Sequence, residues 1–278
     1  MGKKSFYKFD LSGKNALITG SAGLLGYEHA KALLEAGASV VITDIDNKKL
    51  DFLSNKLKSE NSNYKVIKHF LDVTDLDSVN SLEFKIKKEK VNIDILINNA
   101  AINPAVNKNS LIEGSRFENF SNNQWDLEIA VGLTGAFNCS KVFGHSMANN
   151  NGGVIINISS DLSVIAPDNR LYEKKNLDYD NQPVKPVSYS VIKHGLIGLT
   201  KYIATYWPEK KVRCNALSPG GIFNNQGSDF LRKVEKLIPM KRMALKDEYR
   251  GAIQFLSSDA SSYMNGHNLV IDGGRSIW

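Results

Sequence analysis

A strand, a glycine-rich turn, a helix and a second strand follow one another near the start of the chain, and no other feature constrains the fold as much. The apolar residues 15–19 predict a short buried strand, and the glycines at 20, 23 and 26 follow it directly. Apolar residues then recur at helical spacing as far as Gly37, and residues 39–43 predict the next strand. A helix that connects two strands in this way places them parallel in one sheet. The sequence therefore predicts an α/β fold.

The glycine turn also predicts a nucleotide-binding edge. Glycines let the backbone approach a pyrophosphate, and the exposed N–H groups at the start of the helix bind its negative charge. A structural turn explains a lone glycine triplet equally well, but a triplet that opens a strand–helix–strand unit favours a dinucleotide. The residues expected to contact it are Gly20, Ala22, Gly23, Leu24 and Leu25.

Asp44, at the end of the second predicted strand, indicates which dinucleotide is bound. A carboxylate there accepts hydrogen bonds from the adenosine ribose and repels a 2′-phosphate, so we predict NAD rather than NADP, with Ile45 as a further contact. Two alternatives stay open. Asp44 also fits a solvated turn in which Asp46 caps the next helix. Lys48 and Lys49 follow closely and could contact a phosphate.

Tyr189 and Lys193 indicate the chemistry. Four residues apart on a helix, they lie on one face, so the ammonium can hold positive charge near the phenol. An unperturbed phenol titrates at about pH 10, and a nearby cation lowers that pKa toward the range useful to a general acid or base. Surface helices carry the same pair by chance, so context decides. Ser160 supplies that context, because it follows the apolar run 154–158 of another predicted strand.

Together with further motifs, these residues resemble the short-chain dehydrogenase/reductase family from about Leu11 to Gly274. The resemblance implies a Rossmann-like, doubly wound parallel sheet of about seven strands, with helices on both faces in a three-layer sandwich. The further motifs are Asp72-Val73, Asn98-Asn99-Ala100-Ala101, Asn157-Ile158-Ser159-Ser160, Asn215 to Gly220 and Val270 to Gly274.

The same resemblance implies the roles of individual residues. Tyr189 exchanges a proton with the substrate oxygen, and Ser160 hydrogen-bonds that oxygen. Lys193 lowers the tyrosine pKa and binds the nicotinamide ribose, while hydride passes between the substrate carbon and the nicotinamide. For Asn99, a buried amide that ties neighbouring strands together is an equal alternative to cofactor contact. The remaining expected cofactor contacts are Asp72, Val73, Asn99, Ala100, Ala101, Pro219, Gly220 and Ile222, with Tyr189 and Lys193.

Two positions depart from the family pattern. Leu24 replaces a usual glycine, which leaves glycines at 20, 23 and 26. This spacing resembles that of the longer, sugar-nucleotide-modifying branch of the family. Because the chain ends at Trp278 without that branch's extra domain, we place it in the short branch. Gly132 replaces an asparagine that extends a proton relay from the lysine in most members. A glycine inside a helix costs about 1 kcal/mol relative to alanine, so we expect it to make room for a water or a helix bend.

Two segments are expected to surround the substrate. Residues 161–187 form an insertion whose ends are pinned at the catalytic residues, and its many Asn, Asp, Lys, Arg and Tyr side chains favour a polar small molecule. Residues 222–245 occupy the place of the family's substrate-binding lid. The alternative for the insertion is a solvated surface loop without ligand contact, and the alternative for residues 222–245 is an ordinary flexible connection. The basic residues of the insertion that could contact a phosphate or carboxylate are Arg170, Lys174, Lys175 and Lys185.

The composition fits a single domain over residues 1–278, expected in the cytoplasm. Hydrophobic residues make up 42% of the chain, enough for one large core, and the net charge of +6 comes from scattered basic residues, so we expect no nucleic-acid partner. Two cysteines supply neither a metal-ligand set nor a disulfide framework. Residues 1–9 lack an apolar leader segment, and no run approaches the roughly 20 apolar residues that span a membrane.

The leading interpretation is an NAD-dependent oxidoreductase that interconverts a secondary alcohol and a ketone on a sugar, sugar phosphate or nucleotide sugar. The resemblance extends to members linked to bacterial surface-carbohydrate biosynthesis, including flagellin-modifying sugars. It also implies a homodimer or homotetramer assembled through the helices around residues 122–149 and 187–207. The alternatives are a 3-oxoacyl-type NADPH reductase, which Asp44 and the insertion oppose, and a cofactor-binding protein with little turnover, which only Gly132 suggests.

Overall fold

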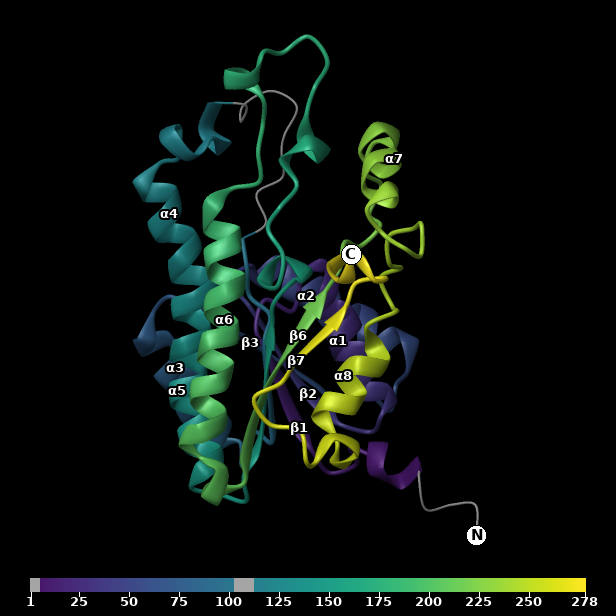
Figure 1. Cartoon of the computed structure of the whole chain (residues 1–278). Coiled ribbons are helices and arrows are strands. Elements are labelled where there is room, and N and C mark those ends of the chain that lie inside the picture. Colours follow the sequence, from purple (N-terminus) through teal and green to yellow (C-terminus); the bar gives the residue numbers. More distant parts are fainter. Residues whose placement is uncertain (1–5, 103–112) are drawn as a thin grey trace.

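One parallel sheet organises the chain, seen in a computed structural model that describes residues 6–102 and 113–278. Its strands are β1 (Asn15–Ile18), β2 (Ser39–Asp44), β3 (Val66–Phe70), β4 (Ile95–Asn98), β5 (Gly153–Ile158), β6 (Val212–Pro219) and β7 (Asn268–Ile271). They lie in the order β3-β2-β1-β4-β5-β6-β7, with every neighbouring pair parallel (Figure 1). The predicted doubly wound sheet is confirmed.

Helices cover both faces of the sheet. The helices are α1 (Leu24–Glu35), α2 (Asn47–Glu60), α3 (Leu76–Lys88), α4 (Asn122–Ile129), α5 (Gly135–Ala148), α6 (Val187–Tyr206), α7 (Ser228–Lys236) and α8 (Arg250–Ser257). Apolar residues of α1, α2 and α8 form one core with the sheet, and those of α3, α5 and α6 form another on the opposite face. Figure 1 shows these two helical layers on either side of the strands, which confirms the three-layer arrangement.

The local sequence explains where these elements begin and end. In β1, Ala16, Leu17 and Ile18 are fully buried, because strands between two helical layers have no solvent-facing side. α2 begins at the predicted cap, since the Asp46 carboxylate accepts a hydrogen bond of 3.1 Å from the Lys49 N–H. The alternative of a capping Asp46 is therefore confirmed.

The insertion and the lid rise together above the carboxyl edge of the sheet (Figure 1). The insertion, residues 161–187, contains three short 3₁₀ turns, η5 (Asp161–Ser163), η6 (Asn169–Tyr172) and η7 (Tyr179–Asn181). The lid, residues 222–245, contains α7, and a β-bridge between Ile222 and Ala244 closes its ends. Leu171 of the insertion packs with Val234 and Ile238 of the lid segment, so the two segments share a small apolar core.

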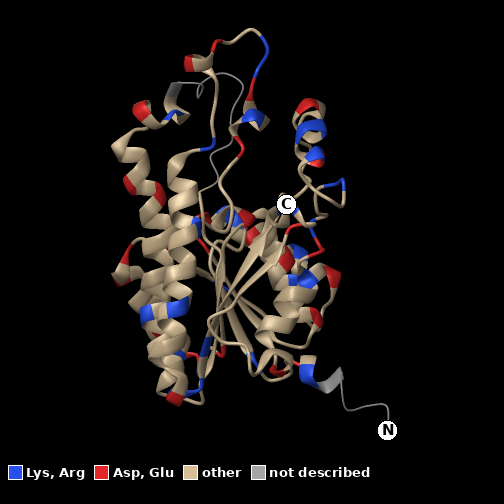
Figure 2. Ribbon diagram, in the orientation of Figure 1, with Lys and Arg blue, Asp and Glu red and all other residues tan. Residues whose placement is uncertain are grey.

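Charges of both signs are interspersed over the ribbon, as the sequence predicts (Figure 2). The lysine-rich end of α3, with Lys85, Lys87 and Lys88, is exposed, as expected for a solvated helix. Among the helices that the structure describes, none is both long and apolar enough to cross a membrane. The first five residues of the basic segment 1–9 lie outside the described range.

Candidate active site

The site lies where the strand order reverses. β1 and β4 are neighbours in the sheet although two strands separate them in the chain, so the loops that follow them leave the carboxyl edge in opposite directions. In open α/β sheets, ligands bind in the crevice that this divergence creates. The glycine turn follows β1, Asn99 to Ala101 follow β4, and Ser160 comes two residues after β5.

The glycine turn has the shape of a phosphate cradle. Gly20 has φ of +60°, and a Cβ there would lie 2.7 Å from the Cα of Ala100, so only glycine fits between the β1 and β4 loops. Gly23 is the N-cap of α1 and makes no side-chain hydrogen bond to the first turn. The N–H groups of that turn, which includes Leu24 and Leu25, are therefore open to an anion. These residues fit the pyrophosphate of a dinucleotide.

Asp44 lies directly against this turn. One carboxylate oxygen accepts a hydrogen bond of 3.0 Å from the Ala22 N–H, and the other accepts one of 3.1 Å from the Asp46 N–H. The Asp44 carboxylate therefore lies where the end of β2 meets the glycine turn. The neighbouring Ile45 side chain is exposed. Asp44 also has a structural role, because it ties the end of β2 to the glycine turn.

The predicted adenine and nicotinamide contacts line the same edge. Asp72 and Val73 follow β3, where Asp72 closes a turn by accepting hydrogen bonds from Thr74. Asn99 donates its amide hydrogens to the carbonyls of Thr19 and Gly20, at 3.0 and 2.9 Å. The structural alternative for Asn99 is therefore realised, because this amide ties β4 to the glycine turn. Ala100 and Ala101 follow it, and Pro219, Gly220 and Ile222 stand at and beyond the end of β6.

Ser160, Tyr189 and Lys193 come together at the end of β5. Tyr189 and Lys193 are one turn apart on α6, and the Lys193 ammonium lies 5.6 Å from the centre of the Tyr189 ring. Ser160 lies close enough to the phenol to lower its pKa. Lys193 donates one hydrogen bond of 2.8 Å to the Ile158 carbonyl, which fixes its position, and within the described part of the chain its other two N–H groups have no partner. The Ser159 hydroxyl also binds the backbone of Lys193, at 2.8 Å.

One electrostatic expectation is wrong. The pKa of Tyr189 is raised above its ordinary value, chiefly because burial disfavours the phenolate; the neighbouring Ser160 side chain acts in the opposite direction, and the charge of Asp161 raises the pKa further. Burial also lowers the pKa of Lys193 to about 8, helped by repulsion from Lys185. The net shift of the Tyr189 pKa is therefore upward, with burial as its largest cause, and not downward as the spacing of Tyr189 and Lys193 predicted.

A buried ion pair beside Ser160 was not predicted. The Ser160 hydroxyl donates a hydrogen bond of 2.8 Å to Asp161, whose other carboxylate oxygen lies 2.9 Å from the Arg275 guanidinium. Both side chains of the pair are almost fully buried, at 4% and 10% exposed. The sequence signal was a carboxylate directly after the catalytic serine at a strand end. Its partner could not be read, because Arg275 lies 114 positions further along the chain.

The reason for Gly132 is close helix packing. Gly132 lies in a π-helical turn, η4 (Ala130–Thr134), between α4 and α5. A Cβ at this position would lie 2.9 Å from Cγ2 of Ile192 on α6. The expected helix irregularity is present, since π turns interrupt a regular helix. The space expected for a water is instead filled by the Ile192 side chain.

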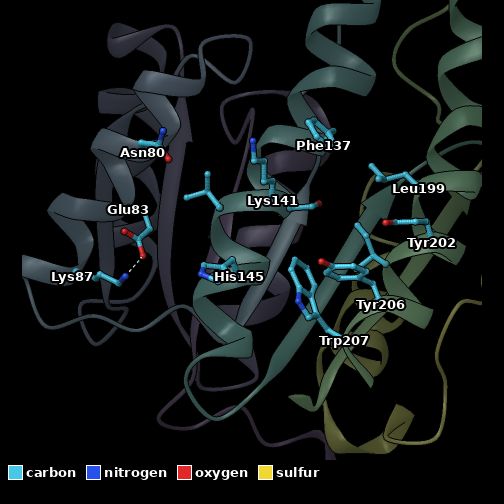
Figure 3. Close-up of a pocket in the computed structure, with 13 residues that line it drawn as sticks. Asn80, Glu83, Lys87, Phe137, Lys141, His145, Leu199, Tyr202, Tyr206 and Trp207 are labelled. Carbon is cyan, nitrogen blue, oxygen red and sulfur yellow. Dashed lines mark ion pairs between the residues drawn. The ribbon is translucent and has the colours of Figure 1, made fainter. Parts of the chain in front are cut away.

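A second hollow lies well away from this site. A cavity of about 620 Å³ opens on the outer face of α3, α5 and α6. Figure 3 shows Phe137 and His145 of α5 and Tyr202 and Tyr206 of α6 along its wall, with a Glu83–Lys87 ion pair on α3 at its rim. The lining is mostly aromatic and aliphatic. None of the predicted cofactor or catalytic residues contributes to it.

The glycine cradle at the reversal point and the Ser160–Tyr189–Lys193 group define a dinucleotide-dependent oxidoreductase. Family models agree: one for short chain dehydrogenases matches residues 14–171, and one described as enoyl-(acyl carrier protein) reductase matches residues 180–276. The chain belongs to the short-chain dehydrogenase/reductase family.

Relatives with assigned names span almost the whole chain. A D-threitol dehydrogenase of Mycolicibacterium smegmatis is 31% identical over 98% of this chain and 96% of its own length. A 3-oxoacyl-[acyl-carrier-protein] reductase of Thermotoga maritima is also 31% identical, over 96% and 99%.

Solved structures show the same fold. A gluconate 5-dehydrogenase from Burkholderia cenocepacia, in complex with NADP and tartrate, has a TM-score of 0.84 and 28% identity, over 98% of each chain. A short chain dehydrogenase from Leptospira borgpetersenii with bound NAD⁺ has a TM-score of 0.82 and 29% identity, over 98% of this chain and 96% of its own.

Proposed function

We propose that this protein interconverts a secondary alcohol and a ketone on a polyhydroxylated small molecule, with NAD as the hydride carrier. The main support for this proposal is the convergence of Ser160, Tyr189 and Lys193 at the carboxyl end of β5, beside a glycine turn that fits the pyrophosphate of a dinucleotide. Among the residues that the structure describes, no cluster of His, Cys, Asp or Glu could hold a metal ion.

The chain's own residues position the substrate oxygen and move its proton. Tyr189 is the proton-transfer group, because its hydroxyl adjoins Ser160 and its ring lies near the Lys193 ammonium. Ser160 holds the oxygen that changes between alcohol and carbonyl. When bound, the nicotinamide accepts or donates the hydride. The two N–H groups of Lys193 that Ile158 does not engage are free for the nicotinamide ribose.

The position of Asp44 supports NAD. Its carboxylate is fixed by two backbone N–H groups at the mouth of the glycine turn, where a 2′-phosphate would meet its charge. Lys49, which could have offset that charge, forms a 3.1 Å ion pair with Asp46. One similar structure holds NADP and another NAD⁺, so the choice depends on such local differences.

The substrate proposed is a polyol, sugar or sugar acid. The insertion that overhangs the site is polar, and relatives of similar length are named for threitol and gluconate. Phosphorylated sugars and nucleotide sugars are included in this proposal, as is the link to bacterial surface-carbohydrate biosynthesis. The 3-oxoacyl reductase is kept as the second candidate, because a relative with that name spans the chain.

The reduced-nicotinamide absorbance tests the proposal directly. The purified protein is mixed with NAD or NADP and a panel of polyols, sugar acids and sugar phosphates, and in the reverse direction with a 3-oxoacyl thioester and NADH or NADPH. We expect NAD reduction with at least one polyhydroxylated compound. Activity confined to the thioester and NADPH would select the second candidate and overturn the argument from Asp44.

We further propose that the cavity face of α5 and α6 binds a second copy of the chain in a homodimer or homotetramer. Of the apolar residues expected there, Phe143, Leu196 and Ile203 are buried within the chain. Tyr202 and Tyr206 are instead 63% and 61% exposed and stack at 5.7 Å. Exposed aromatic residues around an apolar hollow are typical of protein–protein interfaces, which supports self-association.

A further inference from the structure

Lys185 places a second ammonium at the catalytic tyrosine. It immediately precedes Pro186, the N-cap of α6, and its ammonium lies 3.8 Å from the centre of the Tyr189 ring. The Lys193 ammonium is further away, at 5.6 Å. The phenol oxygen is one bond from that ring, so one small molecule can touch both the phenol and the Lys185 ammonium. A positive group therefore lies over the ring of the tyrosine that is proposed to transfer the substrate proton.

This ammonium has no carboxylate partner of its own. Within residues 6–102 and 113–278, no ion pair or side-chain hydrogen bond of Lys185 is present, and the ranges 1–5 and 103–112 contain no Asp or Glu. Two carboxylates act on it from neighbouring elements, but both are engaged elsewhere. Asp161 binds Arg275 and Ser160, and Glu128 of α4 accepts hydrogen bonds from Ser188 and Gln124.

The Lys185 side chain is also half-buried. Burial lowers the pKa of Lys185 to about 8, although the charges of Asp161 and Glu128 act in the opposite direction. An aromatic face offsets only part of the hydration that a cation loses when it is partly withdrawn from water. Cations in such places are normally paired. A ligand that brings a negative charge would satisfy this group.

The backbone holds Lys185 in place before any ligand arrives. Its N–H donates a hydrogen bond of 3.1 Å to the Asn169 side chain, and the Val184 N–H donates one of 3.1 Å to the Ser115 hydroxyl. Pro186 restricts the backbone of Lys185, the residue before it. The other basic residues of the insertion differ from Lys185. Arg170 is paired with Asp168 and lies 79% exposed, and the residues at 174 and 175 are exposed.

We infer that Lys185 binds an anionic group of the substrate, a carboxylate or a phosphate a few bonds from the carbon that is oxidised or reduced. The inference rests on the proposed function, because it assigns a substrate class to the same site. It makes the preferred substrate an acidic polyol, such as a sugar acid or a polyol phosphate, rather than a neutral one. Charge-assisted hydrogen bonds to an ammonium supply the selectivity.

The test is a binding measurement that needs no turnover. Two sets of ligands differ only at one end: glycerol, glycerate and glycerol 3-phosphate, and D-glucitol, D-gluconate and D-glucitol 6-phosphate. Each is titrated by calorimetry into the full-length protein saturated with its preferred dinucleotide. We expect a carboxylate or a phosphate form to bind about ten-fold more tightly than the matched polyol. Whether the carboxylate or the phosphate ligand of a set binds more tightly then identifies the anionic group that the site prefers.

Three variants assign that preference to one residue. Lys185→Gln should bring acid and polyol within about two-fold of each other, Lys185→Arg should keep part of the preference, and Lys175→Gln, on an exposed lysine of the same insertion, should keep all of it. Equal affinities within both sets, undetectable binding included, would overturn the inference, as would a preference that survives in Lys185→Gln. A Lys185-dependent preference without oxidation of any ligand would instead reject the proposed function.

Discussion

At the scale of single residues, Asp161 links the chemistry to the stability of the site. Its negative charge raises the Tyr189 pKa, so Asp161→Asn should lower that pKa. In alcohol oxidation, where Tyr189 accepts the proton, the rising acidic limb of the kcat/KM profile should move to lower pH. The change also leaves the buried Arg275 guanidinium without a carboxylate, which should cost about 3–5 kcal/mol of unfolding free energy. Steady-state pH profiles and urea unfolding measure the two effects.

Asp168→Asn is the matched control. It removes a carboxylate from the exposed Asp168–Arg170 pair in the same insertion, where such pairs contribute at most about 1 kcal/mol. We expect an unchanged pH profile and nearly unchanged stability. An Asp161→Asn variant that behaved like this control would show that the ion pair neither tunes Tyr189 nor supports the site.

His29 is an unpaired polar residue in the core. It is fully buried on α1, neither ring nitrogen has a partner among the described residues, and burial lowers its pKa to about 3. The unfolded chain binds this proton at about pH 6.5 and the folded chain does not, so stability falls as the pH drops from 6.5 toward 3. His29→Leu should flatten this decline, which reaches about 1 kcal/mol per pH unit.

Urea unfolding at several pH values measures that slope. The control is His267→Leu, which removes an exposed histidine and should leave the slope unchanged. An acid slope in His29→Leu as steep as in the unmodified protein would mean that His29 is protonated in the folded state.

The positions of the proposed catalytic residues could be predicted one by one, and their electrostatic setting could not. Ser160, Tyr189 and Lys193 stand at strand ends and on one helix face, positions that local patterns reveal. The sign of the Tyr189 pKa shift depends on burial of the phenol and on the Asp161 charge, and only the folded chain brings these together. The position of the Lys185 ammonium beside the Tyr189 ring was likewise not predictable from the sequence pattern.

At the scale of secondary-structure elements, Gly132 and Ile192 fill one space between η4 and α6. Gly132→Asn alone should cost about 1–3 kcal/mol, because its Cβ meets Ile192. Ile192→Ala alone should cost about 2–4 kcal/mol through a cavity. The double variant should cost less than the sum by at least about 0.5 kcal/mol, since the new side chain occupies the vacated volume.

Urea unfolding of the four proteins gives the coupling energy. Gly198→Ala serves as the control, because a Cβ at this position of α6 meets open space and should stabilise the helix by up to about 1 kcal/mol. Strictly additive effects would contradict direct packing of Gly132 against Ile192. Activity of the double variant also shows whether an asparagine relay helps turnover once it has room.

For the irregular insertion, the sequence predicted its location but not its contacts. Its place was predicted from its two ends, which are fixed by β5 and α6, and the segment lies above the carboxyl edge of the sheet. Its attachment to the lid through Leu171 and through Tyr172, whose ring lies 5.9 Å from that of Phe230, was not predicted. A single aliphatic residue in a polar run carries too weak a periodic signal to identify its partner.

At the scale of the whole molecule, the fold was predictable because alternating strand and helix patterns leave few parallel arrangements. The assembly follows less directly, since apolar residues on α5 and α6 serve both the core and the exposed face.

We expect light scattering to give at least twice the chain mass of 30.8 kDa. Tyr206→Glu should reduce the mass toward that of one chain, whereas Tyr263→Glu, at a fully exposed tyrosine outside this face, should not. A monomer at all concentrations would contradict the proposed interface.

The central claim is that Tyr189 transfers the substrate proton at a dinucleotide site, and Tyr189→Phe tests it most directly. The measurement is substrate-dependent reduction of NAD by this variant and by the unmodified protein, with NAD affinity determined on the same samples. We predict loss of nearly all turnover, about 10²-fold or more, with NAD affinity kept within a few-fold, because the phenol moves the proton and the ring still packs. Turnover at the rate of the unmodified protein would contradict the mechanism.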